Sequence, residues 1–283
     1  MGRWRPIRGG AAGLAVGLAL GAGPALGDDV GPAEDALPSD DAHLTGKDIY
    51  SRVAENRFRS YIQDISLFSS DRGGSEQETR LTITWENFRE KENSDPGVLS
   101  KTMVRYTHPF EVRFTGYLMF NNLDRANDQF VYLASRRRVR RINLRGENLF
   151  GTDFSFEDVV PRELEDSTYR RLPDTIAQEV PVFVVEATPR FSEDSEYSRF
   201  IMHIEKGHYV PLENHYWDTA GVPVKHLIAN RESIRQFGGV WMPTRIGMRH
   251  LLHESETRLV VDRVVPDPEL SRRTFDIRAL EAH

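Results

Sequence analysis

Few residue patterns in the sequence are of a kind that carries out a chemical reaction. None of the motifs G-x-S-x-G, H-E-x-x-H, G-x-x-x-x-G-K and G-x-G-x-x-G, which mark common hydrolases and nucleotide-binding proteins, occurs in the 283 residues. The chain has no cysteine, which excludes a thiol nucleophile, a cysteine-based zinc site, a disulfide framework and a lipid-modified N-terminal cysteine. Carboxylates are abundant, but their spacing singles out no pair for acid–base catalysis. We therefore predict neither an enzyme nor a bound cofactor.

The nine histidines are scattered along the chain, and their spacing does not predict a metal site. His250 and His253 fall in a region expected to be a strand, where an offset of three residues turns side chains to opposite faces. Glu213 and His215 share one strand face, and we interpret them as a surface pair. No metal ligand is predicted.

The strongest charge pattern lies between residues 128 and 158. A dense cationic run over Arg136–Arg141 is followed by an acidic turn over Phe150–Asp158, in which Ser155 and Asp158 predict a capping box. Two interpretations of the arginines stay open: solvated charge at a sheet edge, or a latch on the acidic turn. The latch would pair the arginines with the acids, which are Arg138, Arg140 and Arg141 on one side and Asp153, Glu157 and Asp158 on the other.

The same turn also offers large apolar side chains to a partner surface. A short phenylalanine-rich helix that interrupts a run of strands is typical of a lid over the mouth of a barrel. It fits equally well a helix packed permanently into the core. The expected lid residues are Phe150, Phe154, Phe156 and Val159.

These residues must be positioned by strands, which the sequence predicts for most of the chain. Thr45 and Asp48 predict a capping box that starts a helix over residues 45–57. From Tyr61 onwards apolar and polar residues alternate, beginning with a hairpin whose turn is Asp71–Gly74. Connections are short, so neighbouring strands should pair antiparallel. Beyond the hairpin, strands are expected over Lys101–Tyr106, Val112–Phe120, Asp128–Ala134, Val139–Leu144, Val182–Thr188, Arg199–Glu205, Tyr209–Trp217, Val224–Asn230, Val240–Leu252 and Thr257–Val265.

About a dozen strands in one sheet should curl into a barrel or a half-closed barrel. The stretch Phe130–Leu133 is apolar on both faces, so the sheet must be covered on both sides there. The interior is either a packed core with a covering helix or a cavity for an apolar ligand. The side chains expected to line such a cavity are Leu81, Ile83, Trp85, Phe114, Leu118, Phe120, Phe130, Tyr132, Met242, Ile246 and Met248.

The N-terminal residues indicate export. Residues 1–27 combine arginines, an apolar run and a small-x-small site, which predicts a cleaved Sec-type signal peptide. Residues 28–43 are predicted to be a flexible acidic leader, and residues 44–283 a single β domain. The net charge of −6 at pH 7 disfavours nucleic acid as a partner. We expect a soluble or peripheral product.

Three segments carry a resemblance to a known family: D-Q-F-V-Y-L from Asp128, R-R-R-V-R-R-I from Arg136 and F-G-T-D-F-S-F-E-D from Phe150. They are similar to the signature of the outer-membrane lipoprotein-sorting proteins, relatives of the periplasmic carrier LolA. The family commonly shows Ser and Tyr where Thr152 and Phe156 stand here. Supporting matches over residues 45–280 are Val112–Gly116, Tyr197–Arg199, Lys225–Leu227, Trp241–Pro243 and Phe275–Leu280.

The resemblance implies a mainly β fold with short helices, in which one curved antiparallel sheet forms an unclosed half-barrel with a helical lid. It further implies a monomeric periplasmic carrier that holds the acyl chains of a lipoprotein or lipid in a hydrophobic cavity. An exporter of the resistance-nodulation-division (RND) or ABC type in the inner membrane and an acceptor in the outer membrane would then be partners. Two alternatives stay open: a lipid-binding adaptor for an RND-type exporter, and a structural periplasmic protein with a filled core.

Overall fold

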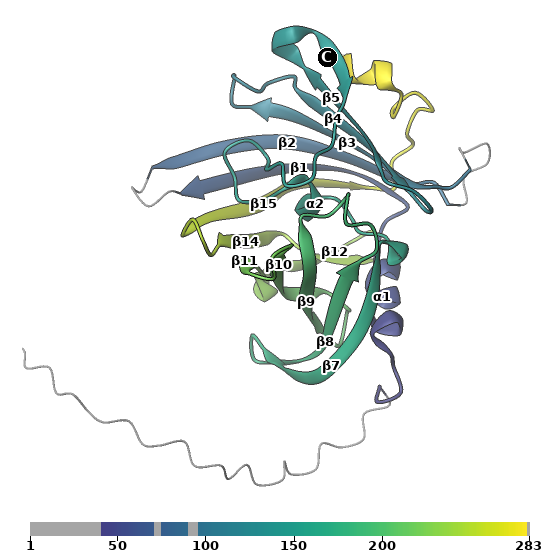
Figure 1. Ribbon diagram of the computed structural model, residues 1–283, viewed down its shortest axis with the longest axis vertical. Helices are drawn as coiled ribbons and strands as arrows, with labels where there is room; N and C mark the ends of the chain where they lie inside the picture. The colour runs from purple at the N-terminus through teal and green to yellow at the C-terminus, as the bar shows by residue number, and fades with distance from the viewer. Residues whose placement is uncertain (1–40, 71–74, 90–95, 282–283) are drawn as a thin grey trace, which may run out of the picture. The chain divides into compact units, whose positions relative to one another are not determined.

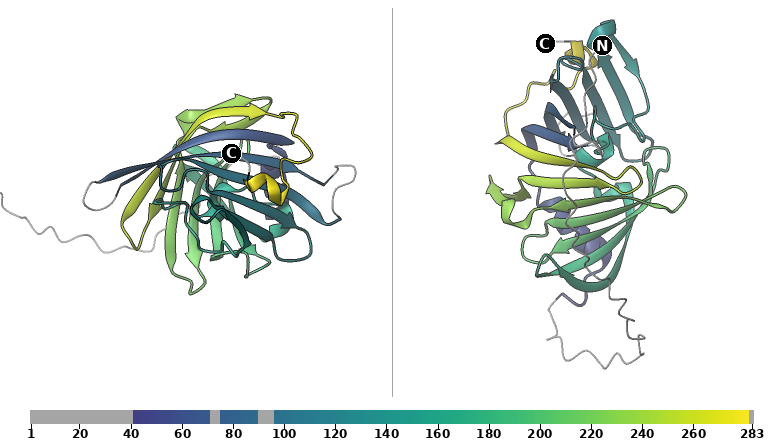
Figure 2. Two further views of the ribbon diagram at one scale, coloured as in Figure 1. Left: turned by 90° about the horizontal axis from the view of Figure 1, so that it is seen from above. Right: turned by 90° about the vertical axis from the view of Figure 1, so that its left-hand side faces the viewer.

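Alternating apolar residues build one large antiparallel sheet in this computed structural model. The structure describes residues 41–70, 75–89 and 96–281, and the account below concerns the compact unit His43–His283. Figures 1 and 2 show that the sheet is strongly curved. Its thirteen strands follow one another in the spatial order β6 (Arg138–Arg141), β5 (Asp128–Leu133), β4 (Gly116–Asn122), β3 (Val98–His108), β2 (Glu76–Asn87), β1 (Ser60–Ser70), β15 (Ser255–Pro266), β14 (Arg245–His250), β11 (Pro223–Ala229), β10 (Pro211–Asp218), β9 (Tyr197–Glu205), β8 (Val180–Pro189) and β7 (Ser167–Ala177).

The topology confirms the predicted half-barrel. Sequence neighbours pair antiparallel, and β1 pairs with β15 to join the first and last strands of the chain. The two end strands, β6 and β7, are not hydrogen-bonded to each other, so the sheet does not close. The predicted first hairpin is present as β1 and β2, while its turn at Asp71–Gly74 lies outside the described residues.

One predicted strand is divided in two. The stretch Val240–Leu252 forms β13 (Val240–Pro243) and β14, and β13 leaves the main sheet to pair with β12 (Ile234–Phe237). Pro243 has no N–H to donate to a ladder, which favours a break at this point. The β12–β13 hairpin turns at Gly238 and Gly239, which both have positive φ, as a type I′ turn requires.

Two α-helices begin at the predicted capping boxes. In α1 (Gly46–Glu55), the Thr45 N–H donates to Asp48 Oδ2 at 2.8 Å, and the Asp48 N–H donates back to Thr45 Oγ1 at 3.2 Å. Helix α1 lies against β7 and β8 (Figure 1). A Cβ atom at Gly46 would be only 2.7 Å from the Arg171 backbone nitrogen, so glycine permits this close approach. Helix α2 (Phe156–Val159) begins after its N-cap Ser155, whose N–H donates to Asp158 Oδ2 at 2.9 Å. Short 3₁₀ helices occupy η1 (Ala134–Arg136), η2 (Leu164–Asp166), η3 (Arg231–Ser233) and η4 (Ile277–Glu281).

Strand register assigns the apolar residues to two faces. Ile83 faces Val104 across β2 and β3, and both belong to the main core, which also holds the residues around α2. We call this face of the sheet the inner face. Met103 lies opposite Leu118 on the other, outer face, where a second cluster includes Phe275 and Leu280 from the C-terminal segment. On β5, the consecutive residues Val131 and Tyr132 point to opposite faces and are both buried, which confirms that the sheet is covered on both sides near Phe130–Leu133.

In the part of the chain that the structure describes, no helix has both the length and the apolar composition needed to cross a membrane. The predicted signal peptide over residues 1–27 and most of the predicted leader over residues 28–43 lie outside the described residues.

Candidate functional site

An apolar cleft of about 330 Å³ lies between helix α1, strand β1, strand β10 and strand β13. Volumes of roughly 300–1,000 Å³ are typical of ligand sites. Polar groups are few, and Arg57 and Arg162 are the charged side chains at its wall. Its principal apolar lining residues are Tyr50, Val53, Phe58, Tyr61, Trp241 and Met242.

The β12–β13 hairpin is fastened to helix α1 along one side of the cleft. The side-chain amide of Asn56 donates to the Trp241 carbonyl at 2.8 Å, and the Trp241 N–H donates to Asn56 Oδ1 at 2.8 Å. Asn56 is also the C-cap of α1, so one residue ends the helix and holds the hairpin. The Trp241 ring lies 4.1 Å from the His208 ring, which packs the hairpin against the β9–β10 turn.

A connecting segment, here called the inner loop (Glu147–Arg162), crosses the inner face of the sheet. The Thr79 hydroxyl donates to the Phe150 carbonyl at 2.9 Å, and the Phe150 N–H donates to the Tyr106 hydroxyl at 3.0 Å. At the next residues, Asp153 accepts hydrogen bonds from the hydroxyls of Ser255 at 2.5 Å and Thr257 at 2.8 Å. The loop is thus fixed to β2, β3 and β15 at once.

Buried charges fix the end of the inner loop. Asp158 lies 3.1 Å from Lys225 Nζ on β11 and accepts a hydrogen bond from the Tyr197 hydroxyl at 2.8 Å. Glu157 lies 3.3 Å from the Arg162 guanidinium and accepts from the Ser195 hydroxyl at 2.6 Å. Burial raises the pKa of the Glu157 carboxyl.

The predicted latch requires correction. Among the described residues, Arg141 pairs with Asp128 on the neighbouring strand, and Arg138 and Arg140 are exposed on β6. The acids of the inner loop take other partners: Asp153 takes two hydroxyls, while Glu157 and Asp158 take Arg162 and Lys225. The arginines of β6 lie at the sheet edge, as the alternative interpretation expected, because β6 is an end strand.

The predicted lid residues do not share one environment. Phe154 is 1% exposed, Phe156 is buried and Val159 packs against them, all within the main core. Phe150 is 40% exposed. The ring of Phe156 lies 4.2 Å from that of Tyr117 on β4. This packing is the arrangement expected for the alternative of a helix built into the core, and opening of the loop stays a proposal.

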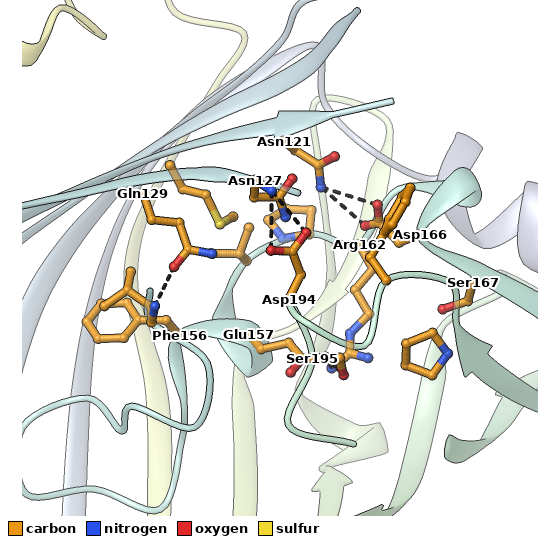
Figure 3. Close-up of a pocket in the computed structure, with 16 residues that line it drawn as sticks. Asn121, Asn127, Gln129, Phe156, Glu157, Arg162, Asp166, Ser167, Asp194 and Ser195 are labelled. Carbon is orange, nitrogen blue, oxygen red and sulfur yellow. Dashed lines mark hydrogen bonds and ion pairs between the residues drawn. The ribbon is translucent and has the colours of Figure 1, made fainter. Parts of the chain in front are cut away.

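A second, smaller pocket lies behind the inner loop. Its volume is about 70 Å³, enough for a few water molecules but not for an acyl chain. Figure 3 shows Asn121 beside Asp166 and Asn127 beside Asp194 at its wall. Burial raises the pKa of Asp166 to about 6. Pro161 and Arg162 line both this pocket and the apolar cleft, so the inner loop forms the partition between them.

The predicted cavity residues are divided by the register into several environments. Met242 lines the apolar cleft, while Leu81, Ile83, Trp85, Ile246 and Met248 belong to the main core. Phe114 lies in the β3–β4 turn with φ 68° and is exposed, rather than in the predicted strand. Four residues assigned to the same cavity face instead belong to the outer cluster: Leu118, Phe120, Phe130 and Tyr132.

Most of the cleft was missed by the sequence reasoning. Tyr50 and Val53 lie on the predicted helix, whose apolar face was a usable signal, and Trp241 lies in the predicted strand Val240–Leu252, on the face opposite to Met242. The histidine pair is also corrected. Strand β14 ends at His250, so His253 lies in a turn and the two rings stack at 3.9 Å instead of pointing to opposite faces.

The comparisons with known proteins agree with this architecture. The model of the DUF1329 family, described as a protein of unknown function, matches residues 48–143, and a second family model, described as an uncharacterized protein, matches residues 99–282. No curated protein matches the chain.

Solved structures with the same fold are known. A domain described as a proposed outer membrane lipoprotein-sorting protein from Vibrio parahaemolyticus superposes with a TM-score of 0.74 at 21% identity, covering 83% of this chain and 98% of that chain. A DUF1329 family protein from Desulfovibrio piger gives a TM-score of 0.74 at 21% identity, with coverages of 83% and 97%. A LolA superfamily protein from Nitrosomonas europaea gives a TM-score of 0.67 at 17% identity, with coverages of 82% and 97%. At these identities the likeness shows the fold.

Proposed function

We propose that this chain, which has a LolA-like fold and whose residues 48–143 match the DUF1329 family model, carries the acyl chains of a lipid or lipoprotein. The observation that carries this proposal is the apolar cleft under helix α1. The carrier acts in the periplasm, to which the predicted signal peptide over residues 1–27 would direct it. An exporter in the inner membrane and an acceptor in the outer membrane complete the proposed route.

The size of the cleft fits part of one acyl chain. At about 30 Å³ for each water-sized group, 330 Å³ holds on the order of ten methylene groups. Each buried methylene is stabilised by about 0.8 kcal/mol, so a bound chain segment gains about 8 kcal/mol before the cost of ordering it. A longer chain requires the inner loop or the β12–β13 hairpin to move aside.

One observation favours the competing structural role. The inner loop places Leu149, Phe154 and Phe156 in the main core, so much of the inner face is already filled. A structural protein with a filled core needs no cargo, whereas a carrier must bind an acyl chain at the cleft. The two roles therefore differ in a binding measurement.

The test uses a dansyl-labelled undecanoic acid as the probe. Met242→Glu places a carboxylate in the apolar cleft, and burial of an unpaired charge is costly, so we expect the affinity for the probe to fall at least about tenfold. Ile176→Glu is the matched control, because Ile176 on β7 is 72% exposed and does not line the cleft. The control should bind like the unmodified protein.

The alternative outcomes are decisive. If the unmodified protein does not bind the probe, or if Met242→Glu binds it equally well, the carrier role at this cleft is wrong. The class of cargo follows from mass spectrometry of lipids and lipopeptides that copurify with the protein from its native host. Copurified lipopeptides support lipoprotein carriage, and free lipids alone support lipid carriage, whether as a carrier or as an adaptor for an RND-type exporter.

A further inference from the structure

Three histidines and a glutamate gather on the outer face of the sheet, away from the apolar cleft. His203 alternates along β9 with Met202 and Ile204 of the main core, so its side chain points to the opposite face. Register places His203 opposite Glu213, and His215 opposite His226. The group therefore spans three adjacent strands, β9, β10 and β11.

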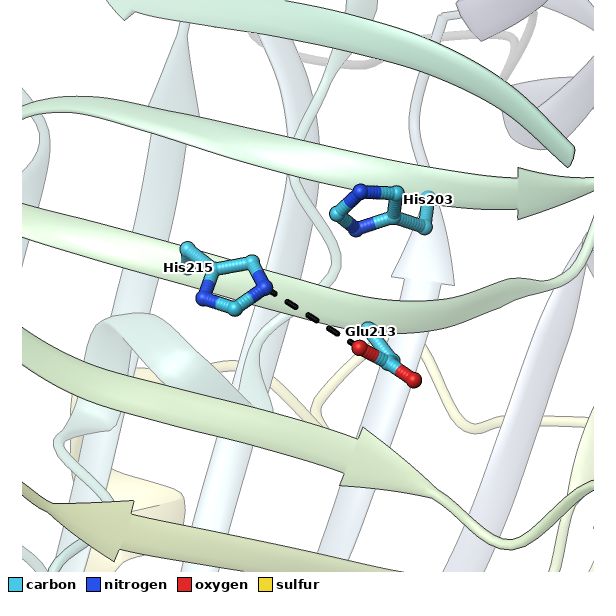
Figure 4. A group of neighbouring side chains, drawn as sticks. All are labelled: His203, Glu213 and His215. Carbon is cyan, nitrogen blue, oxygen red and sulfur yellow. Dashed lines mark ion pairs between the residues drawn. The ribbon is translucent and has the colours of Figure 1, made fainter. Parts of the chain in front are cut away.

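The side-chain nitrogen atoms converge on one carboxylate. Figure 4 shows His203 and His215 on neighbouring strands beside Glu213. Nε2 of His215 lies 3.9 Å from Oε2 of Glu213, and Nε2 of His226 lies 3.4 Å from the same oxygen. One ligand atom from each of His203, Glu213 and His215 lies within 4.8 Å of the other two.

Two of the imidazole nitrogens form no hydrogen bond within the described residues. Nδ1 of His203 and Nε2 of His226 are buried and form no hydrogen bond with any other part of the chain that the structure describes. An orphaned buried nitrogen is costly unless something else satisfies it.

We propose that His203, Glu213 and His215, with His226 beside them, bind a divalent transition-metal ion such as Zn²⁺. Two imidazole nitrogens and one carboxylate oxygen are the protein ligands of His₂Glu zinc sites. Zinc bonds of 2.0–2.2 Å require donor atoms about 3.4 Å apart. The donor atoms of the three residues now lie within 4.8 Å of one another, so small side-chain rotations would bring them to the distance that zinc needs. Hard cations such as Mg²⁺ prefer oxygen ligands and are not expected here. The bound ion would join β9 to β10, with His226 of β11 beside it.

The experiment uses tag-free full-length protein that has been treated with a chelator. Added Zn²⁺ should bind with one equivalent per chain and raise the melting temperature, since a ligand that binds only the folded state stabilises it. Added Co²⁺ should give the visible absorption of a tetrahedral site. The variants His203→Ala, Glu213→Gln and His215→Ala should each weaken Zn²⁺ binding at least about tenfold. Circular dichroism checks that each variant is folded.

The matched control is the double variant His250→Ala/His253→Ala. It removes the other pair of neighbouring histidine rings and leaves the proposed ligands intact. It should bind Zn²⁺ like the unmodified protein. The proposal is wrong if excess Zn²⁺ neither binds nor changes the melting temperature, if the ligand variants bind equally tightly, or if the control abolishes binding. Failure here leaves the carrier role untouched, because no proposed ligand lines the apolar cleft.

Discussion

Asp166 couples the stability of the protein to pH. Its carboxylate accepts hydrogen bonds from the Glu163 N–H at 2.7 Å and from the Asn121 amide at 3.2 Å, yet burial raises its pKa to about 6, against 3.8 for a free carboxyl. At a pH between 3.8 and about 6, the carboxyl is therefore protonated in more of the folded molecules than of the unfolded molecules. The contribution of Asp166 to the free energy of unfolding is therefore most favourable below about pH 4, and it is lost as the pH rises through 6.

Asp166→Asn should remove this dependence. The amide stays neutral at every pH, and Asn121 Oδ1, which lacks a hydrogen-bond partner among the described residues, is a ready acceptor for the new N–H₂ group. Relative to the unmodified protein, the variant should gain on the order of 2 kcal/mol between pH 4 and pH 7. Urea unfolding at both pH values measures the difference. Parallel stability profiles would contradict the assignment to Asp166.

The sequence predicts the partner of a side chain well where the two residues lie close together in the chain. The capping pairs Thr45 with Asp48 and Ser155 with Asp158 were both identified, because a cap depends on residues three positions apart. The partners of Glu157 and Asp158 were assigned wrongly. Asp158 meets Lys225, a contact 67 residues away that only the fold determines. Nothing in the local pattern distinguishes Lys225 from the nearer arginines.

At the level of elements, Asn56 at the end of helix α1 fastens the β12–β13 hairpin along one side of the cleft. Asn56→Ala removes both hydrogen bonds to the Trp241 backbone, at about 1 kcal/mol each. We expect faster amide exchange over residues 234–243 and faster release of the dansyl fatty acid. Hydrogen–deuterium exchange and stopped-flow fluorescence measure the two effects.

Gln236→Ala is the control for this prediction. Gln236 bonds to Gly239 inside the same hairpin and does not contact α1 in the hydrogen bonds described. Its loss should leave both exchange and release nearly unchanged. Equal exchange in the Asn56 and Gln236 variants would mean that the hairpin is held by packing alone.

The strands were predicted from the alternation of apolar and polar residues, and the strands that this pattern missed or misplaced have physical causes. Strand β7 was not predicted because it contains Pro173 and has mostly exposed side chains. An end strand tolerates both features, since one of its edges needs no partner. The face of each strand was harder to assign, because a shift of one residue reverses it. Leu118 and Phe130 lie opposite each other on the outer face rather than in the predicted cavity.

For the whole molecule, the C-terminal segment acts as the cover of the outer cluster. Leu280 is fully buried there, and Arg105 donates to the carbonyls of Ala279 and Leu280. Leu280→Ala should lower the free energy of unfolding by about 2–5 kcal/mol, as expected for a core leucine. It should also increase binding of the dye ANS to the uncovered surface. Urea titration and dye fluorescence measure these changes.

Ile277→Ala provides the comparison in the same 3₁₀ helix. Ile277 is 41% exposed, so its truncation should change the stability by about 0.5 kcal/mol or less. Binding of the dansyl fatty acid should be unchanged in both variants, because the cleft lies on the inner face. Equal stability losses in the two variants would mean that the segment does not cover the cluster as described.

The unclosed sheet leaves two border strands, and their composition bears on self-association. A free border is a template on which a second copy could extend the ladder into a fibril. Strand β6 presents exposed Arg138, Arg140 and Arg141, which would face identical charges in an approaching copy. Strand β7 contains Pro173, which has no N–H to donate to a strand of a second copy. Electrostatic repulsion at one end and a missing donor at the other thus oppose polymerisation of a protein that cannot close its own sheet.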